Sequence, residues 1–250
     1  MRLPPQHDAA VQVIGFPTAG NGCGQFGPIA RAAAGRLDVW AANLPGRHAR
    51  FGEPPYTTYA PLIDELVPAL RKSLDGRPYA LLGYCSGALL AYGVTRALLA
   101  EGAPPPATLV CVAYPAPRDG MHTDLSGLSS PAFWDYVVQA GGVPKELDVE
   151  AHRPLFEPAL RADYAVLADY RHTEHEPFPT TRILGVLGDE EPQWLRRDMT
   201  GWARVTGAGF RMKELTGGHW LLHESTEAFT DLLVHELSGA SGELSGASGA

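Results

Sequence analysis

The sequence lacks the features that mark membrane-spanning and nucleic-acid-binding proteins. No stretch of its 250 residues approaches 18 consecutive apolar residues, so we expect no membrane span. Lysine and arginine total 20, are scattered along the chain, and are outnumbered by 28 acidic residues, which leaves a net charge of −8. Because a surface that binds phosphates needs clustered basic side chains, nucleic acid is not expected as a partner.

Cysteine is also scarce. The three cysteines, Cys23, Cys85 and Cys111, are odd in number and widely spaced, which excludes a disulfide framework and suits a reducing compartment. Residues 1–8 show no apolar run typical of a secretory signal. We therefore expect a cytoplasmic protein. Its 45% hydrophobic and 19% charged residues are typical of a globular chain.

Short apolar runs alternate with segments of helical periodicity. Strands are predicted at residues 11–16, 37–44, 79–84, 109–113, 183–187 and 210–215. Helices are predicted at residues 27–34, 62–73, 87–101, 193–205 and 224–237. Several of the strands are almost continuously apolar, as expected when both faces of a parallel sheet are covered. The pattern predicts an α/β fold, with a mostly parallel sheet flanked by helices.

Two segments depart from this alternation. Residues 119–178 carry no strand pattern but contain helical signals near 131–138 and 155–170. We interpret this insertion as a helical lid over an active site, the alternative being a packing layer on the sheet. Residues 237–250 are rich in Gly, Ser and Ala and repeat the motif Glu-Leu-Ser-Gly-Ala-Ser-Gly, which predicts a flexible tail after a single domain over 1–236.

The most specific motif is Gly83-Tyr84-Cys85-Ser86-Gly87, placed between a predicted strand and a predicted helix. This is the setting of a nucleophile elbow, whose flanking glycines allow a sharp turn. Counted from the glycines, the apex is Cys85, and the Ser86 amide faces the apex as an oxyanion donor. The sequence thus predicts Cys85 rather than Ser86 as the nucleophile. The alternative is a glycine-rich turn around a small buried cysteine.

A thiol nucleophile needs a base. His219 follows the last predicted strand, and the order nucleophile, acid, histidine is that of α/β-hydrolases. The loop after the penultimate strand offers three adjacent carboxylates, Asp189, Glu190 and Glu191, of which at least two are expected to be merely solvated.

Two histidine pairs have a close spacing that metal ligands can show: His219 with His223, and His172 with His175. No cluster of Cys or carboxylate residues completes a site beside either pair, so no metal is expected.

Taken together, the motifs are similar to those of a known family. They are Phe16-Pro17-Thr18-Ala19-Gly20, Leu44-Pro45-Gly46-Arg47 with Arg50, Pro78 to Gly83 with the elbow, Phe156 to Tyr164, and Gly217-Gly218-His219. The chain resembles the type II thioesterases, stand-alone α/β-hydrolases that work beside modular polyketide synthases and nonribosomal peptide synthetases. The resemblance covers residues 11–237.

The resemblance implies a Cys-His-acid triad of Cys85, His219 and Glu191, the last being the residue before the proline of the loop. Asp189 is the second candidate acid. Asp119, just past the strand at 109–113, is the third, because some hydrolases place their acid there. The family usually has Ser and Asp where this chain has Cys85 and Glu191.

The resemblance also implies the surroundings of the triad. The turn at Thr18 and Ala19 supplies one oxyanion amide and Ser86 the other, while Asn21 replaces a common second glycine and is expected to tolerate a left-handed backbone. No cofactor is expected to be bound. An acyl or peptidyl carrier protein would present its phosphopantetheine arm, with an acyl-thioester substrate, to a channel under the lid.

A cysteine at the apex bears on the reaction. The acyl-enzyme is then itself a thioester, which reacts with amines and carbanions more readily than an oxyester does. Chain release by hydrolysis therefore competes, as a hypothesis, with acyl transfer by aminolysis or Dieckmann-type cyclisation. Two further alternatives are a non-catalytic carrier-binding module and an unrelated small-molecule esterase of the same fold.

Overall fold

A parallel six-stranded sheet lies at the centre of the computed structural model, which describes residues 1–4, 9–120, 123–143 and 149–244. The strands are β1 (Gln12–Phe16), β2 (Asp38–Ala41), β3 (Tyr79–Tyr84), β4 (Thr108–Val112), β5 (Arg182–Gly188) and β6 (Phe210–Leu215). Their order is β2-β1-β3-β4-β5-β6, and every neighbouring pair is parallel. Both ends of five strands lie within two residues of the prediction. Strand β2 begins one residue late and ends three residues early.

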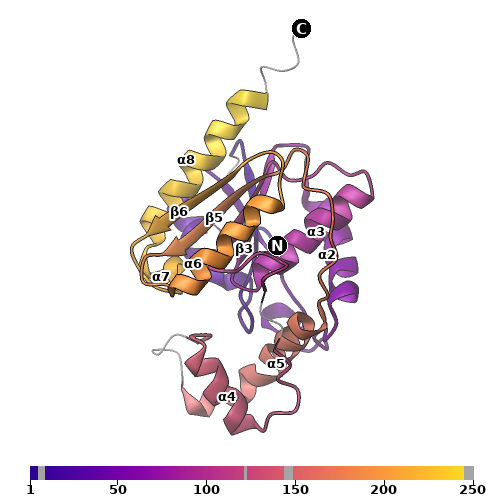
Figure 1. Cartoon of the computed structure of the whole chain (residues 1–250), viewed down its shortest axis with the longest axis vertical. Coiled ribbons are helices and arrows are strands. Elements are labelled where there is room, and N and C mark those ends of the chain that lie inside the picture. Colours follow the sequence, from indigo (N-terminus) through magenta and orange to yellow (C-terminus); the bar gives the residue numbers. More distant parts are fainter. Residues whose placement is uncertain (5–8, 121–122, 144–148, 245–250) are drawn as a thin grey trace.

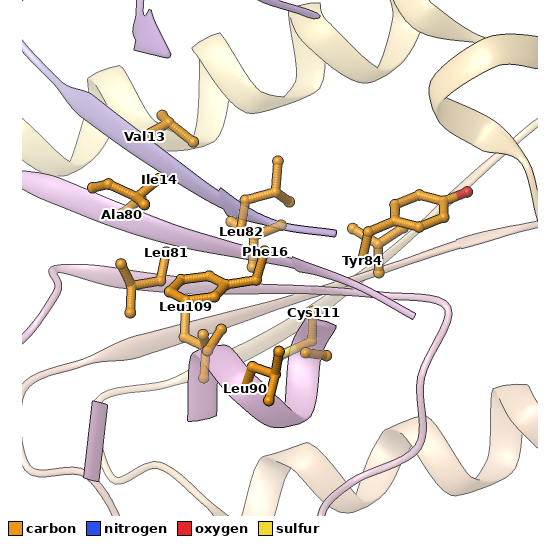
Figure 2. Close-up of a cluster of buried hydrophobic side chains, with 14 of the residues drawn as sticks. Val13, Ile14, Phe16, Ala80, Leu81, Leu82, Tyr84, Leu90, Leu109 and Cys111 are labelled. Atoms are coloured by element: carbon orange, nitrogen blue, oxygen red, sulfur yellow. The ribbon is translucent and has the colours of Figure 1, made fainter. Parts of the chain in front are cut away.

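Apolar strands occupy the middle of this sheet because helices cover both of its faces. All six residues of β3 are buried, and so are all five of β1 and β4. Figure 2 shows their side chains, among them Leu81, Leu82 and Leu109, packed between helices on either side of the strands. The residues of the edge strand β6 are instead exposed or half-buried, which agrees with its mixed sequence Phe-Arg-Met-Lys-Glu-Leu.

The helices that flank the sheet follow the strands in alternation (Figure 1). They are α1 (Gly27–Ala32), α2 (Tyr59–Ser73), α3 (Gly87–Ala100), α6 (Gln193–Met199), α7 (Leu221–Glu224) and α8 (Thr226–Leu244). Helix α1 packs against α8, and α2 packs against α3. The helix predicted over 193–205 is divided into α6 and the 3-10 helix Thr200–Arg204.

The predicted insertion contains helices joined by loops, with no strand among its described residues. Helix α4 (Ser130–Gln139), the 3-10 helix Glu150–His152 and α5 (Arg153–Asp169) lie between β4 and β5 in the chain. They lie beyond one end of the sheet, at the bottom of Figure 1. Helices α4 and α5, together with Leu125 before them, form a small apolar core of Leu125, Phe133, Trp134, Val137 and Leu160. Residues 121–122 and 144–148 of the predicted lid lie outside the described residues.

The end of the chain differs from the prediction. Helix α8 continues to Leu244, whereas a flexible tail was predicted from residue 237. The segment 237–244 contains no proline, and each glycine lowers helix stability by only about 1 kcal/mol relative to alanine, so the helix can continue through it. Residues 245–250 of the predicted tail lie outside the described residues.

Candidate active site

Cys85 lies at a sharp turn between β3 and α3. Its φ is 48°, a left-handed value that costs a non-glycine residue about 1–3 kcal/mol. The flanking glycines make room for the turn. A Cβ at Gly83 would collide with the backbone of Ala88, and one at Gly87 would collide with the carbonyl of Phe16. The motif therefore forms a strand-turn-helix elbow with Cys85 at its apex.

His219 and Glu191 come together from two neighbouring loops. His219 follows β6, and Glu191 lies between β5 and α6. The His219 Nδ1 atom lies 2.7 Å from Glu191 Oε1, and the Glu191 side chain is only 6% exposed. The Tyr84 hydroxyl donates a hydrogen bond to the His219 carbonyl, a contact that the sequence did not suggest. His219 is thus held by Glu191 at its ring and by Tyr84 at its backbone carbonyl.

The charges of this group favour an ionised thiol. Burial raises the pKa of Cys85, but the charge of His219 and hydrogen bonds from His219, Thr18 and the Ser86 amide outweigh it, so the pKa is below its ordinary value. Burial lowers the pKa of His219, but Cys85 and Glu191 together raise it to about 10. Both shifts favour a thiolate beside an imidazolium over a neutral thiol beside a neutral imidazole.

The other two candidate acids have different partners. Asp189 Oδ1 accepts a hydrogen bond of 3.0 Å from the Gly217 amide. Asp119 Oδ2 forms an ion pair of 3.0 Å with Arg204. Within the described part of the chain, Glu191 is the carboxylate that the structure brings to the His219 ring. Asp189 stabilises the loop that carries His219.

The backbone amides of the predicted oxyanion turn already donate hydrogen bonds to side chains of the protein. The Thr18 amide donates to Gln25 Oε1 at 3.0 Å, and the Ala19 amide donates to Ser86 Oγ at 2.8 Å. The Ser86 amide donates toward the Cys85 sulfur, which helps to lower the pKa of that thiol. Neither amide of the turn is therefore without a partner.

A buried ion pair joins the insertion to this turn. Both nitrogens Nη1 and Nη2 of Arg47 lie 2.7 Å from the Asp163 carboxylate, on side chains that are 7% and 13% exposed. Asp163 also accepts the Gly20 amide at 2.7 Å, and Arg47 donates to the Asn21 carbonyl at 2.8 Å. The left-handed residue of the turn is Gly20, with φ of 75°, and not Asn21 as expected. The sequence marked Arg47 and Asp163 as motif residues without indicating that they meet.

A cavity beside Cys85 has a volume of about 400 Å³, which is within the range of small-molecule sites. Its walls include Cys85, His219 and Glu191, and the insertion contributes Tyr136, Leu160, Tyr164 and Leu167. A larger groove of about 740 Å³ lies beside Tyr59, Arg96 and Tyr170, but none of the three triad candidates lines it. We take the smaller cavity as the candidate site because the reactive groups meet there.

The remaining cysteines have no such surroundings. Cys23 and Cys111 are 3% and 0% exposed, and burial raises the pKa of both thiols. In the described part of the chain, no three His, Cys, Asp or Glu side chains gather as a metal site would require. None of the described helices is both long and apolar enough to span a membrane.

Comparisons with known proteins show the family and the fold of this chain. The family model described as thioesterase domain matches residues 11–236. The type II thioesterase BorB from the borrelidin biosynthetic cluster is 28% identical, with a TM-score of 0.85 over 95% of this chain and 96% of that one. The RedJ thioesterase from the prodiginine pathway of Streptomyces coelicolor is 28% identical, with a TM-score of 0.82 over 93% and 88%. Linear gramicidin dehydrogenase LgrE of Brevibacillus parabrevis is 29% identical over 239 residues, which cover 92% of this chain and 89% of that protein. The predicted α/β-hydrolase fold is confirmed.

Proposed function

This chain belongs to the thioesterase domain family, and we propose that it releases acyl chains from carrier-protein thioesters through an acyl-enzyme on Cys85. The observation that carries the proposal is the meeting of Cys85, His219 and Glu191 at one cavity. The names of its relatives support the setting, because BorB and RedJ are described as thioesterases of biosynthetic pathways. Medium-chain thioesterases of fatty acid synthesis are related as well, at 26% identity for the human protein.

In the first half-reaction the Cys85 thiolate attacks the carbonyl carbon of the substrate thioester. A carbon–sulfur bond forms, and the carbonyl oxygen becomes an oxyanion. As the intermediate collapses, the bond to the pantetheine sulfur breaks, and His219 protonates that leaving thiolate. Glu191 stabilises the imidazolium form of His219 before this transfer. The product is an acyl chain attached to Cys85 and a free carrier thiol.

In the second half-reaction His219, now neutral, takes a proton from water. The resulting nucleophile attacks the acyl carbon, and the carbon–sulfur bond to Cys85 breaks. Because His219 holds the proton taken from water and cleavage of the carbon–sulfur bond leaves Cys85 as a thiolate, the thiolate–imidazolium pair is restored at this step. The carboxylic acid leaves and loses its own proton to solvent. The apolar side chains of the insertion, such as Leu160 and Leu167, supply a dry wall for the acyl chain.

The cysteine itself favours a second outcome. Because the acyl-enzyme remains a thioester, an amine or carbanion of the substrate can take the acyl group in place of water. Aminolysis or a Dieckmann-type cyclisation would then release the chain. A non-catalytic carrier-binding module is less favoured, because a decayed site would not be expected to keep His219 beside a buried Glu191.

The name of the gramicidin relative raises a different activity. The segment after β1 does contain Gly22, Gly24 and Gly27, the spacing of a dinucleotide-binding turn. In this fold, however, the space above Gly22 is filled by the imidazole of His48. The glycines therefore make room for a side chain of the protein and not for a pyrophosphate, and we do not extend a dehydrogenase activity to this chain.

Acyl-pantetheine thioesters test the proposal directly. Intact mass spectrometry should detect one acyl group, peptide mapping should place it on Cys85, and Cys85→Ala should abolish it. The matched control, Cys111→Ser, should leave acylation unchanged. Acylation that persists in Cys85→Ala would refute the acyl-enzyme.

The variant Cys85→Ser separates the two release routes. An oxyester is the poorer donor to amines and carbanions, so if transfer is the natural route, the ratio of transferred to hydrolysed product should fall. A tenfold fall needs a difference of only ~1.4 kcal/mol between the two barriers. An unchanged ratio would show that the cysteine does not select the acceptor, leaving hydrolysis as the proposed reaction.

A further inference from the structure

The Ser86 hydroxyl contacts the turn that follows β1. The Ala19 amide, which the family resemblance assigns to the oxyanion site, donates to Ser86 Oγ at 2.8 Å. The two residues are far apart in the chain, and the contact joins the turn after β1 to the residue that follows the nucleophile. An oxyanion could not take this amide without displacing the hydroxyl.

The hydroxyl has no role in capping its helix. Ser86 is the N-cap residue of α3, a position where a serine usually accepts a hydrogen bond from the first turn. Here the backbone of Ser86 is helical, with φ of −53° and ψ of −27°, and its side chain makes no capping bond. The side chain is instead turned toward Ala19. Its removal should therefore cost α3 little stability.

The hydroxyl still has a proton to donate. A serine oxygen carries one O–H donor and two lone pairs, and the Ala19 amide uses a lone pair. Among the described residues, the structure provides no acceptor for that proton. Ser86 is 6% exposed and lines the same cavity as Cys85. A hydroxyl that accepts from an amide is also polarised, which strengthens it as a donor.

We propose that the Ser86 hydroxyl, held by the Ala19 amide, donates a hydrogen bond to the oxyanion formed when Cys85 attacks the thioester. Ser86 would then supply two donors, its amide and its hydroxyl. The reason lies in the nucleophile. A carbon–sulfur bond is longer than a carbon–oxygen bond, so the carbonyl stands farther from the elbow than in a serine enzyme. A side-chain donor extends farther from the backbone than an amide does, toward an oxygen displaced in this way. The inference rests on the proposed function.

Two reactions of the same sulfur test this role. Acylation by an acyl-pantetheine thioester passes through an oxyanion, whereas alkylation by iodoacetamide at Cys85 does not. In Ser86→Ala, the single-turnover acylation rate should fall by about 10²–10³, the usual effect of removing one oxyanion donor. The alkylation rate should stay close to that of the wild type. Ser73→Ala, which removes a remote hydroxyl bonded to the Leu70 carbonyl, is the matched control and should change neither rate.

Ser86→Gly provides a second truncation should the alanine variant fold poorly, and Ser86→Thr, which keeps a hydroxyl, should recover part of the acylation rate. Acylation at the wild-type rate in both truncations would overturn the proposal, as would an equal loss of acylation and alkylation. Failure of the wild type to acylate at Cys85 would refute the proposed function itself. A loss of the donor role alone would leave wild-type acylation intact, so the two failures can be told apart.

Discussion

Replacing Glu191 by glutamine removes one charge from the candidate triad and keeps the shape of the side chain. The carboxylate lies 2.7 Å from His219 Nδ1 and is 6% exposed, so little water competes for the contact. A glutamine can also donate to that nitrogen, which would favour the wrong tautomer of the imidazole. Both effects weaken the imidazolium that Cys85 needs.

The expected loss follows from the strength of this contact. Hydrogen bonds to charged groups contribute about 1.5–3 kcal/mol, which corresponds to about 10- to 10²-fold in rate. The pH dependence should change as well. Without the negative charge, the pKa of His219 falls and the pKa of Cys85 rises. The alkylation of Cys85 should therefore require a higher pH in Glu191→Gln than in the wild type.

Single-turnover acylation, followed by intact mass, gives the rate, and iodoacetamide labelling across pH gives the thiolate profile. Asp189→Asn and Asp119→Asn are the matched controls. Asparagine at 189 can still accept the Gly217 amide, and the ion pair of Asp119 with Arg204 is exposed, so each should have a small effect.

One pattern of results would refute this assignment: Glu191→Gln behaves like the wild type, and one of the two controls loses activity. A damaging Asp119→Asn would place the acid after β4. A damaging Asp189→Asn would place it at the start of the loop.

Three further predictions concern the elbow and its support. Iodoacetamide should label Cys85 well before Cys111, and at pH values below the range of an ordinary thiol, because the pKa of Cys85 is lowered while burial raises that of Cys111; equal labelling in peptide maps would contradict this. Gly87→Ala should lower the free energy of unfolding by about 1–3 kcal/mol and reduce acylation, since the added Cβ would collide with the backbone carbonyl of Phe16. Urea titration measures the first effect and the acylation assay the second. An unaffected variant would argue against the close approach of Gly87 to Phe16. Asp163→Asn should lower the free energy of unfolding by about 3–5 kcal/mol, because Arg47 stays buried without its charged partner and the Gly20 amide loses a charged acceptor. The control Asp231→Asn, from an exposed ion pair, should lower it by about 0–1 kcal/mol. Similar urea midpoints for the two variants would show that the buried pair is not stabilising.

The alternation of strands and helices could be predicted because it depends on local patterns. Strands buried on both faces are almost continuously apolar, so β1, β3 and β4 stand out in the sequence. The boundaries of α8 were less predictable, because glycine and serine weaken a helix without ending it. The helical insertion could be predicted because it interrupts the strand pattern of the sequence. Its contacts with the rest of the fold could not be predicted from that pattern.

Local spacing by itself determined the elbow, since a strand, two glycines and a helix within a few residues leave one apex, Cys85. Only the tertiary structure decided which carboxylate faces His219, because Asp189, Glu190 and Glu191 are adjacent in the chain and differ only in how the loop turns them. The same holds for the contact of Ala19 with Ser86 and for the contacts of Asp163, in the insertion, with Arg47 and with the Gly20 amide of the turn after β1. These pairs come from segments far apart in the sequence. A local sequence pattern cannot predict such contacts, because they depend on how the sheet, the loops and the insertion pack in space.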